Sequence, residues 1–150
     1  MEATLNRNTR SFDDGYDGIV IRHAFEDKVG GATIDATGYA RNYIRRGHLI
    51  IKATDGTLKP MPLNTGGTAY AALPADHTYY GVANASADVQ GNGIQVSILH
   101  RFAMNHKVVD ADAGVFGIPA GILTAVKTAL PLATYKKTTK QQSNALMQSL

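Results

Sequence analysis

The clearest strand signal in this 150-residue chain is the stretch Ile94-Gln-Val-Ser-Ile-Leu-His-Arg-Phe-Ala-Met-Asn105. Apolar side chains occupy positions 94, 96, 98, 102 and 104, whereas polar ones occupy positions 95, 97, 101 and 105. Successive side chains of a strand point to opposite faces, so the pattern predicts one buried and one wetter face. Leu99 and His100 interrupt the alternation, which indicates that the outer face is partly covered.

This strand ends a block, residues 47–105, that we interpret as a small antiparallel β unit. The block opens with Gly47-His-Leu-Ile-Ile-Lys-Ala, turns at Thr54-Asp-Gly-Thr and continues through Tyr79-Tyr-Gly-Val-Ala. Pro60, Pro62 and a Gly66-Gly67 pair lie between these pieces, and prolines cannot occupy a central strand. Residues 59–76 are therefore expected to form a long surface loop.

Upstream, Ile19-Val-Ile-Arg-His-Ala-Phe25 predicts a strand with Ile19, Ile21 and Phe25 on one face. A Gly30-Gly31 turn then leads to a second short strand that begins at Ala32. This part of the chain is expected to extend the β unit toward the N-terminus.

Downstream, the stretch from Pro119 to Leu130 predicts one helix. Its apolar positions 122, 123, 126 and 130 form a stripe at helical spacing. Pro119 suits the first helical position and Pro131 ends the run. Residues 132–135 are expected to form a short closing strand.

Composition predicts one globular domain with a real core, because 44% of residues are hydrophobic and 18% are charged. The chain has no cysteine, which excludes disulfides, thiolate zinc sites and cysteine nucleophiles. No apolar run approaches the roughly 20 residues that span a bilayer, and the N-terminus lacks the hydrophobic segment of a signal peptide. We therefore expect no membrane partner and no export.

The two ends differ from the centre. Residues 1–18 are polar and rich in Gly and Asp, and we expect an extended N-terminal arm that orders against a partner or stays loose. Residues 136–150 form a polar, basic C-terminal tail; residues 113–150 contain four lysines and no acid. The chain has neither RNA-binding aromatic signatures nor a dense Arg/Lys stripe, so we expect no direct nucleic-acid partner.

The sequence carries no motif for catalysis, a metal or a cofactor. Residues 13–18 are acidic but fail the spacing of an EF-hand loop, so we interpret them as a turn. Residues 110–114 resemble only half of a calcium-binding loop. The closest pair of histidines, His100 and His106, does not have the spacing of metal ligands on one strand or helix. We expect His100 to be half-buried and hydrogen-bonded.

The order and the residue patterns of these segments resemble those of the head decoration proteins of tailed bacteriophages, the phage lambda decoration protein group. The resemblance covers roughly residues 17–135. Its marks are Gly18-Ile-Val-Ile-Arg-His-Ala-Phe, Gly30-Gly-Ala-Thr-Ile-Asp-Ala-Thr-Gly, Gly47-His-Leu-Ile-Ile-Lys, Asp55-Gly-Thr-Leu-Lys-Pro, Tyr80-Gly-Val-Ala, the 94–105 strand and the helix.

The resemblance implies a mostly β fold with one small helix, forming a compact antiparallel β-barrel or β-tulip-like domain over residues 19–135. It also implies a homotrimer on the outside of a capsid, with an N-terminal arm that lies along the lattice of the major capsid protein and can add a strand to it. The capsid-contact residues expected in this arm are Arg7, Arg10, Phe12 and Tyr16.

The function expected from this resemblance is that of a structural virion protein that reinforces the phage head, with no enzymatic activity and no cofactor. It would lie on the capsid exterior, and in the host cytoplasm during assembly. Two alternatives stay open: a head-fibre base that carries a receptor- or glycan-binding attachment, and a trimeric β-fold enzyme. The enzyme would require Asp and His residues that converge in a cleft.

Overall fold

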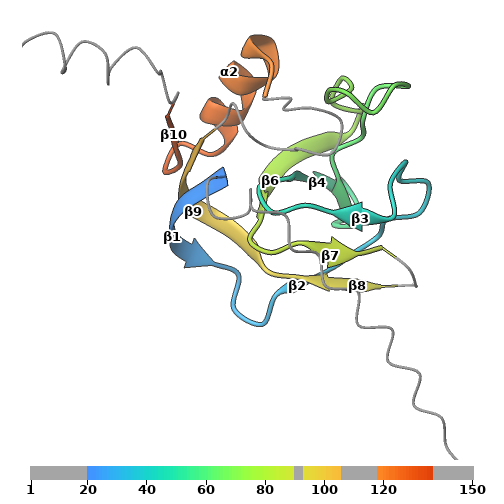
Figure 1. Cartoon of the computed structure of the whole chain (residues 1–150), viewed down its shortest axis with the longest axis horizontal. Coiled ribbons are helices and arrows are strands. Elements are labelled where there is room, and N and C mark those ends of the chain that lie inside the picture. Colours follow the sequence, from blue (N-terminus) through green and yellow to red (C-terminus); the bar gives the residue numbers. More distant parts are fainter. Residues whose placement is uncertain (1–19, 90–92, 106–117, 137–150) are drawn as a thin grey trace, which may run out of the picture.

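The computed structural model describes residues 20–89, 93–105 and 118–136. Four predicted features lie outside these residues and stay predictions: the N-terminal arm, most of the basic tail, His106 and the two acidic segments 13–18 and 110–114. The labels follow Figure 1. The strands are β1 (Ile21–Asp27), β2 (Ala32–Ile34), β3 (Tyr43–Ile44), β4 (Leu49–Ala53), β5 (Leu58–Pro60), β6 (His77–Ala83), β7 (Ala87–Asp88), β8 (Ile94–Val96), β9 (Ile98–Asn105) and β10 (Thr134–Lys136), and the helix is α2 (Ala120–Ala129).

One main sheet organises the described part of the chain. Its strands follow the order β1-β9-β6-β4-β5, and β10 also pairs with β9. Two small two-stranded sheets, β2-β8 and β3-β7, complete the fold. Figure 1 shows α2 on one side of the main sheet and the β2-β8 pair on the other. The predicted mostly β class with one small helix is confirmed.

Two parts of the predicted architecture are wrong. The main sheet stays open, so the domain is not a closed barrel. The closing strand β10 runs parallel to β9, whereas the other strand pairs of the main sheet are antiparallel. A parallel neighbour needs a long crossover connection, and here the residues between β9 and β10 include α2.

The buried strand β4 explains why both faces of the sheet are covered. Leu49, Ile50 and Ile51 are at most 1% exposed, although consecutive strand residues point to opposite faces. Leu49 and Ile51 join the hydrophobic cluster that includes α2, whereas Ile50 joins the cluster that includes β2 and β8. A continuous apolar run is typical of a strand buried on both faces.

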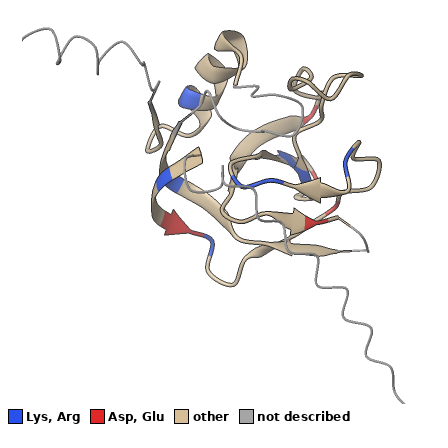
Figure 2. Ribbon diagram, viewed as in Figure 1, with Lys and Arg blue, Asp and Glu red and all other residues tan. Residues whose placement is uncertain are grey.

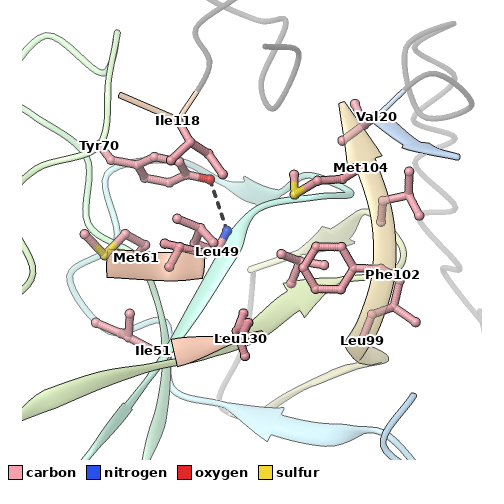
Figure 3. Close-up of a cluster of buried hydrophobic side chains, with 13 residues drawn as sticks. Val20, Leu49, Ile51, Met61, Tyr70, Leu99, Phe102, Met104, Ile118 and Leu130 are labelled. Carbon is pink, nitrogen blue, oxygen red and sulfur yellow. Dashed lines mark hydrogen bonds between the residues drawn. The ribbon is translucent and has the colours of Figure 1, made fainter. Parts of the chain in front are cut away.

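The helix-side core ties the 59–76 segment to the sheet (Figure 3). Met61 and Tyr70 are buried in this core, and the Leu49 amide donates a hydrogen bond of 3.0 Å to the Tyr70 hydroxyl. The buried ring of His48 also donates from Nε2 to the Met61 carbonyl, at 2.9 Å. The prediction that this segment is a surface loop is therefore only partly right, because these contacts anchor it inside the domain.

The predicted helix is confirmed nearly to the residue. It begins one position after Pro119, which therefore precedes the first turn instead of occupying it. Val126 and Leu130 are buried and Ile122 and Leu123 pack against the same core, as the stripe predicts. No capping side chain holds its start, so the helix depends on this packing.

Irregular pairing accompanies the broken alternation in β9 and an error in β1. In the register of β1 against β9, three residues have no paired residue on the other strand: Arg22, Phe25 and His100. The sequence predicts that Phe25 shares the buried face of Ile21, but Phe25 is 59% exposed and is itself an extra residue. Every residue of β1 after Ile21 is exposed, so the alternation does not continue along this edge strand.

Gly81 in β6 provides a test of this packing. A Cβ atom there would lie 2.5 Å from the carbonyl oxygen of Leu99 and 2.7 Å from Cγ2 of Ile98. Gly81→Ala is expected to lower the free energy of unfolding by about 1–3 kcal/mol, because the crowded strands must separate. Urea denaturation measures the change.

Gly121→Ala is the matched control, because a Cβ at this helical position meets nothing within 4 Å. This variant is expected to gain about 0.5–1 kcal/mol from helix propensity. Equal stabilities for Gly81→Ala and the wild type would contradict the close approach of β6 and β9.

Candidate functional site

The described surface exposes three large hydrophobic side chains. They are Phe25 in β1, Val29 in the turn that follows, and Leu132 between α2 and β10, with exposed fractions of 59%, 94% and 67%. Since β1 and β10 both pair with β9, all three lie on or beside strands that flank β9. We call these three residues the β9-flank set. Val29 lies near the start of β9, where the Lys28 amide donates to the Ile98 carbonyl, and Leu132 lies near its end, where Thr134 pairs with Ala103. The set is therefore spread along β9 and would suit a partner that extends along this strand.

Phe25 is the aromatic member of this set. Its ring lies 5.8 Å from the ring of His23, and the Arg101 guanidinium lies 5.4 Å from its centroid. Cation–π contacts of this kind keep an arginine beside an aromatic ring, and Arg with aromatic residues is the combination enriched in protein interfaces. Sequence reasoning missed this group because the strand pattern does not show that β1 lies at the edge of the sheet and is exposed after Ile21.

Charges of both signs are interspersed over the described fold (Figure 2). Acidic Glu26 and Asp27 follow Phe25 directly in β1, and basic Lys28 comes next. A mixed surface of this kind favours a protein partner over a polyanion, which would select for one continuous basic face.

A second group forms where the pairing of β6 and β9 ends. Tyr80 is the extra residue in β6, and its carbonyl accepts a hydrogen bond of 2.9 Å from Nδ1 of His100, the extra residue in β9. The two rings meet edge to face, with centroids 4.7 Å apart. His100 is therefore partly buried and hydrogen-bonded, as predicted, and it satisfies a carbonyl left over by the bulge.

A cleft of about 320 Å³ lies at the β5 edge of the sheet. We call it the Asp35 cleft. Its walls are mostly apolar and rich in proline: Tyr39, Ala40, Ile51, Pro60, Pro62, Leu63 and Pro74. Its polar side chains are Asp35, Thr37, Lys59 and His77. Mostly apolar walls with a few convergent polar groups are typical of a small-molecule site.

Asp35 and Lys59 form an exposed ion pair at this cleft. Their Oδ2 and Nζ atoms are 3.6 Å apart, and their side chains are 39% and 41% exposed. The other carboxylate oxygen of Asp35 accepts a hydrogen bond of 3.0 Å from the Thr37 amide. Hydrogen bonds from Thr37, and then the charge of Lys59, lower the pKa of Asp35 below its usual value, so the carboxylate is ionised at neutral pH.

The neighbouring turn repeats this arrangement. Asp55 accepts a hydrogen bond of 2.8 Å from the Thr57 amide, and hydrogen bonds to Thr57 likewise lower the pKa of the Asp55 carboxyl. His77 lines the cleft and holds the Ala75 carbonyl 2.7 Å from Nδ1. Because a carbonyl only accepts hydrogen bonds, Nδ1 carries the proton.

A wider hollow of about 610 Å³ lies beside β2 and the β4–β5 turn. Its polar lining consists of Lys28, Asp35 and the three threonines 33, 37 and 57. Asp35 and Thr37 border both this hollow and the Asp35 cleft.

The predicted capsid-contact residues Arg7, Arg10, Phe12 and Tyr16 lie outside the described residues. Among residues that are described, no group of three or more His, Cys, Asp or Glu side chains is placed to hold a metal ion. No described helix is long and apolar enough to cross a membrane.

Comparisons with family models, curated proteins and solved structures give no match.

Removing the charge of Asp35 tests its electrostatic role. A lowered folded-state pKa means that ionised Asp35 stabilises the fold above its usual pKa of 3.8, and that this contribution disappears as the pH falls through the lowered value. Asp35→Asn keeps an acceptor for the Thr37 amide but has no charge. Urea midpoints should show the wild type more stable than Asp35→Asn near neutral pH, and the gap should close in acid. If the urea midpoints of the wild type and Asp35→Asn fall equally between neutral and acidic pH, this role is contradicted.

Proposed function

We propose that this chain is a structural protein of a tailed-phage virion that binds the outer surface of the capsid and reinforces the head lattice. In this proposal the major capsid protein is its partner and a homotrimer is its working form. The observation that carries the proposal is the β9-flank set: Phe25, Val29 and Leu132 are exposed around one strand of a small open sheet. Such a surface gains stability when a partner covers it.

The position of this surface along the chain supports the same function. Strand β1 begins at Ile21, directly after the segment proposed as the capsid-binding arm. A subunit that binds through β1 would therefore start its arm beside the same contact. Three arms and three flank surfaces of a trimer would bind together, so each contact can be weak while the whole complex is stable.

The bulges of β1 bear on how a partner would bind. Two extra residues in an edge strand disturb the regular row of backbone donors and acceptors, and bulges of this kind discourage pairing with another strand. We therefore expect a partner to contact the exposed side chains of β1 and not to continue the main sheet there. In this proposal only the N-terminal arm adds a strand, and it adds it to a sheet of the major capsid protein.

The test measures solution mass by light scattering, then co-sedimentation with expanded capsids of the source virus. A trimer that co-sediments is expected, and deletion of residues 1–17 should weaken capsid binding. The double variant Phe25→Ser, Val29→Ser should also weaken assembly or capsid binding, by about tenfold or more, because apolar contact area is lost.

Ala85→Ser is the control, since it places a serine at an exposed position in the turn between β6 and β7. A monomer that does not bind capsids would refute the proposal. A trimer that ignores capsids but binds glycans or host cells would support the head-fibre alternative instead.

A further inference from the structure

The Asp35 cleft has a feature that the proposed capsid function does not use. Its apolar walls come from three prolines, a leucine and a tyrosine, and at the cleft the Asp35 carboxylate and the Lys59 ammonium group lie 3.6 Å apart. An ion pair that is about two-fifths exposed and this long contributes little to stability. Its two charges are therefore available to a ligand.

The charges also match one kind of ligand. Oδ1 of Asp35 accepts a hydrogen bond from the Thr37 amide, and Oδ2 lies 3.6 Å from the Lys59 ammonium, a long contact that a ligand can replace. A ligand with an ammonium and a carboxylate group on one carbon could bind Asp35 with the first and Lys59 with the second. It would replace one weak ion pair by two charge-assisted contacts.

The edge of β5 argues against an extended peptide as the occupant. The Leu58 carbonyl already accepts a hydrogen bond of 2.9 Å from the Asp35 amide. Pro60 has no amide hydrogen to offer a new strand. A peptide could therefore not pair regularly with β5, and the cleft volume of about 320 Å³ is at the small end of the range for ligand pockets.

We propose that the Asp35 cleft binds a free amino acid with an apolar side chain. The ammonium group binds Asp35, the carboxylate binds Lys59, and the side chain packs against Pro60, Pro62 and Leu63. This inference is independent of capsid binding, because the cleft lies at the β5 end of the main sheet and the β9-flank set lies toward the other end.

The experiment titrates the ¹⁵N-labelled full chain at neutral pH with three probes that share the isobutyl side chain of leucine. They are L-leucine, isoamylamine, which lacks the carboxylate, and isocaproate, which lacks the amino group. L-leucine is expected to shift the amide signals of Thr37 and Leu63 saturably. Each analogue should bind at least about tenfold more weakly, since each loses one charged contact.

Two variants and a matched control test which side chain binds which charged group of L-leucine. Lys59→Gln should lower the affinity for L-leucine to that of isoamylamine, and Asp35→Asn should lower it to that of isocaproate. Lys52→Gln, which removes an exposed lysine of β4 that does not line the cleft, should leave the affinity unchanged.

Three outcomes would overturn the proposal. They are no saturable shift with L-leucine, an analogue that binds as tightly as L-leucine, or equal losses in Lys59→Gln and Lys52→Gln. If Asp35→Asn does not fold, the comparison of Lys59→Gln with Lys52→Gln still tests whether L-leucine binds at this cleft. None of these measurements involves capsids, so failure here leaves the capsid proposal untouched.

Discussion

The fold depends on a strand that must be covered on both faces. Leu49, Ile50 and Ile51 follow one another in β4 and are all buried, so neither face of the central sheet can be left in water. Burying three such side chains contributes on the order of 1.5–3 kcal/mol each relative to exposure. One face requires α2 and the anchored 59–76 segment, and the other requires the small strands β2 and β8.

Buried polar groups fix how these layers meet. His48 is fully buried, yet it is held by the Met61 carbonyl and lies between two tyrosine rings, those of Tyr39 and Tyr70, with centroids 5.4 and 5.1 Å away. A buried polar side chain is costly unless it is hydrogen-bonded. These bonds therefore specify one position for the 59–76 segment, which apolar packing alone would not.

The sequence predicts the local elements well and their long-range pairing poorly. The alternation over residues 94–105 and the helical stripe of α2 are properties of neighbouring residues, and both were predicted. The sequence predicts one strand over 94–105, however, whereas the structure divides it into β8 and β9, which belong to different sheets. The extra residues Arg22 and Phe25 in β1 and the parallel pairing of β10 depend on partners far away in sequence, which periodicity does not report. The Asp35 cleft was missed for the same reason: Asp35, Lys59 and His77 meet only after β2, β5 and β6 are in place.

The two surfaces that carry the proposals belong to different parts of the main sheet. The β9-flank set lies around β1, β9 and β10, and the Asp35 cleft lies at β5. A subunit covered by a partner at the first surface would leave the second accessible. In the two proposals, attachment and ligand recognition therefore use different parts of one small sheet.

The pairing of β1 with β9 also sets the order in which the chain can fold during synthesis. The first described strand leaves the ribosome early, but its partner is made only after β2 to β8. Until then, the strand that carries Phe25 has no place in the main sheet. The closing strand β10 comes later still and joins the same β9. A nascent chain therefore holds an incomplete sheet for most of its translation, and such intermediates are the ones that chaperones engage and that aggregate when synthesis is fast.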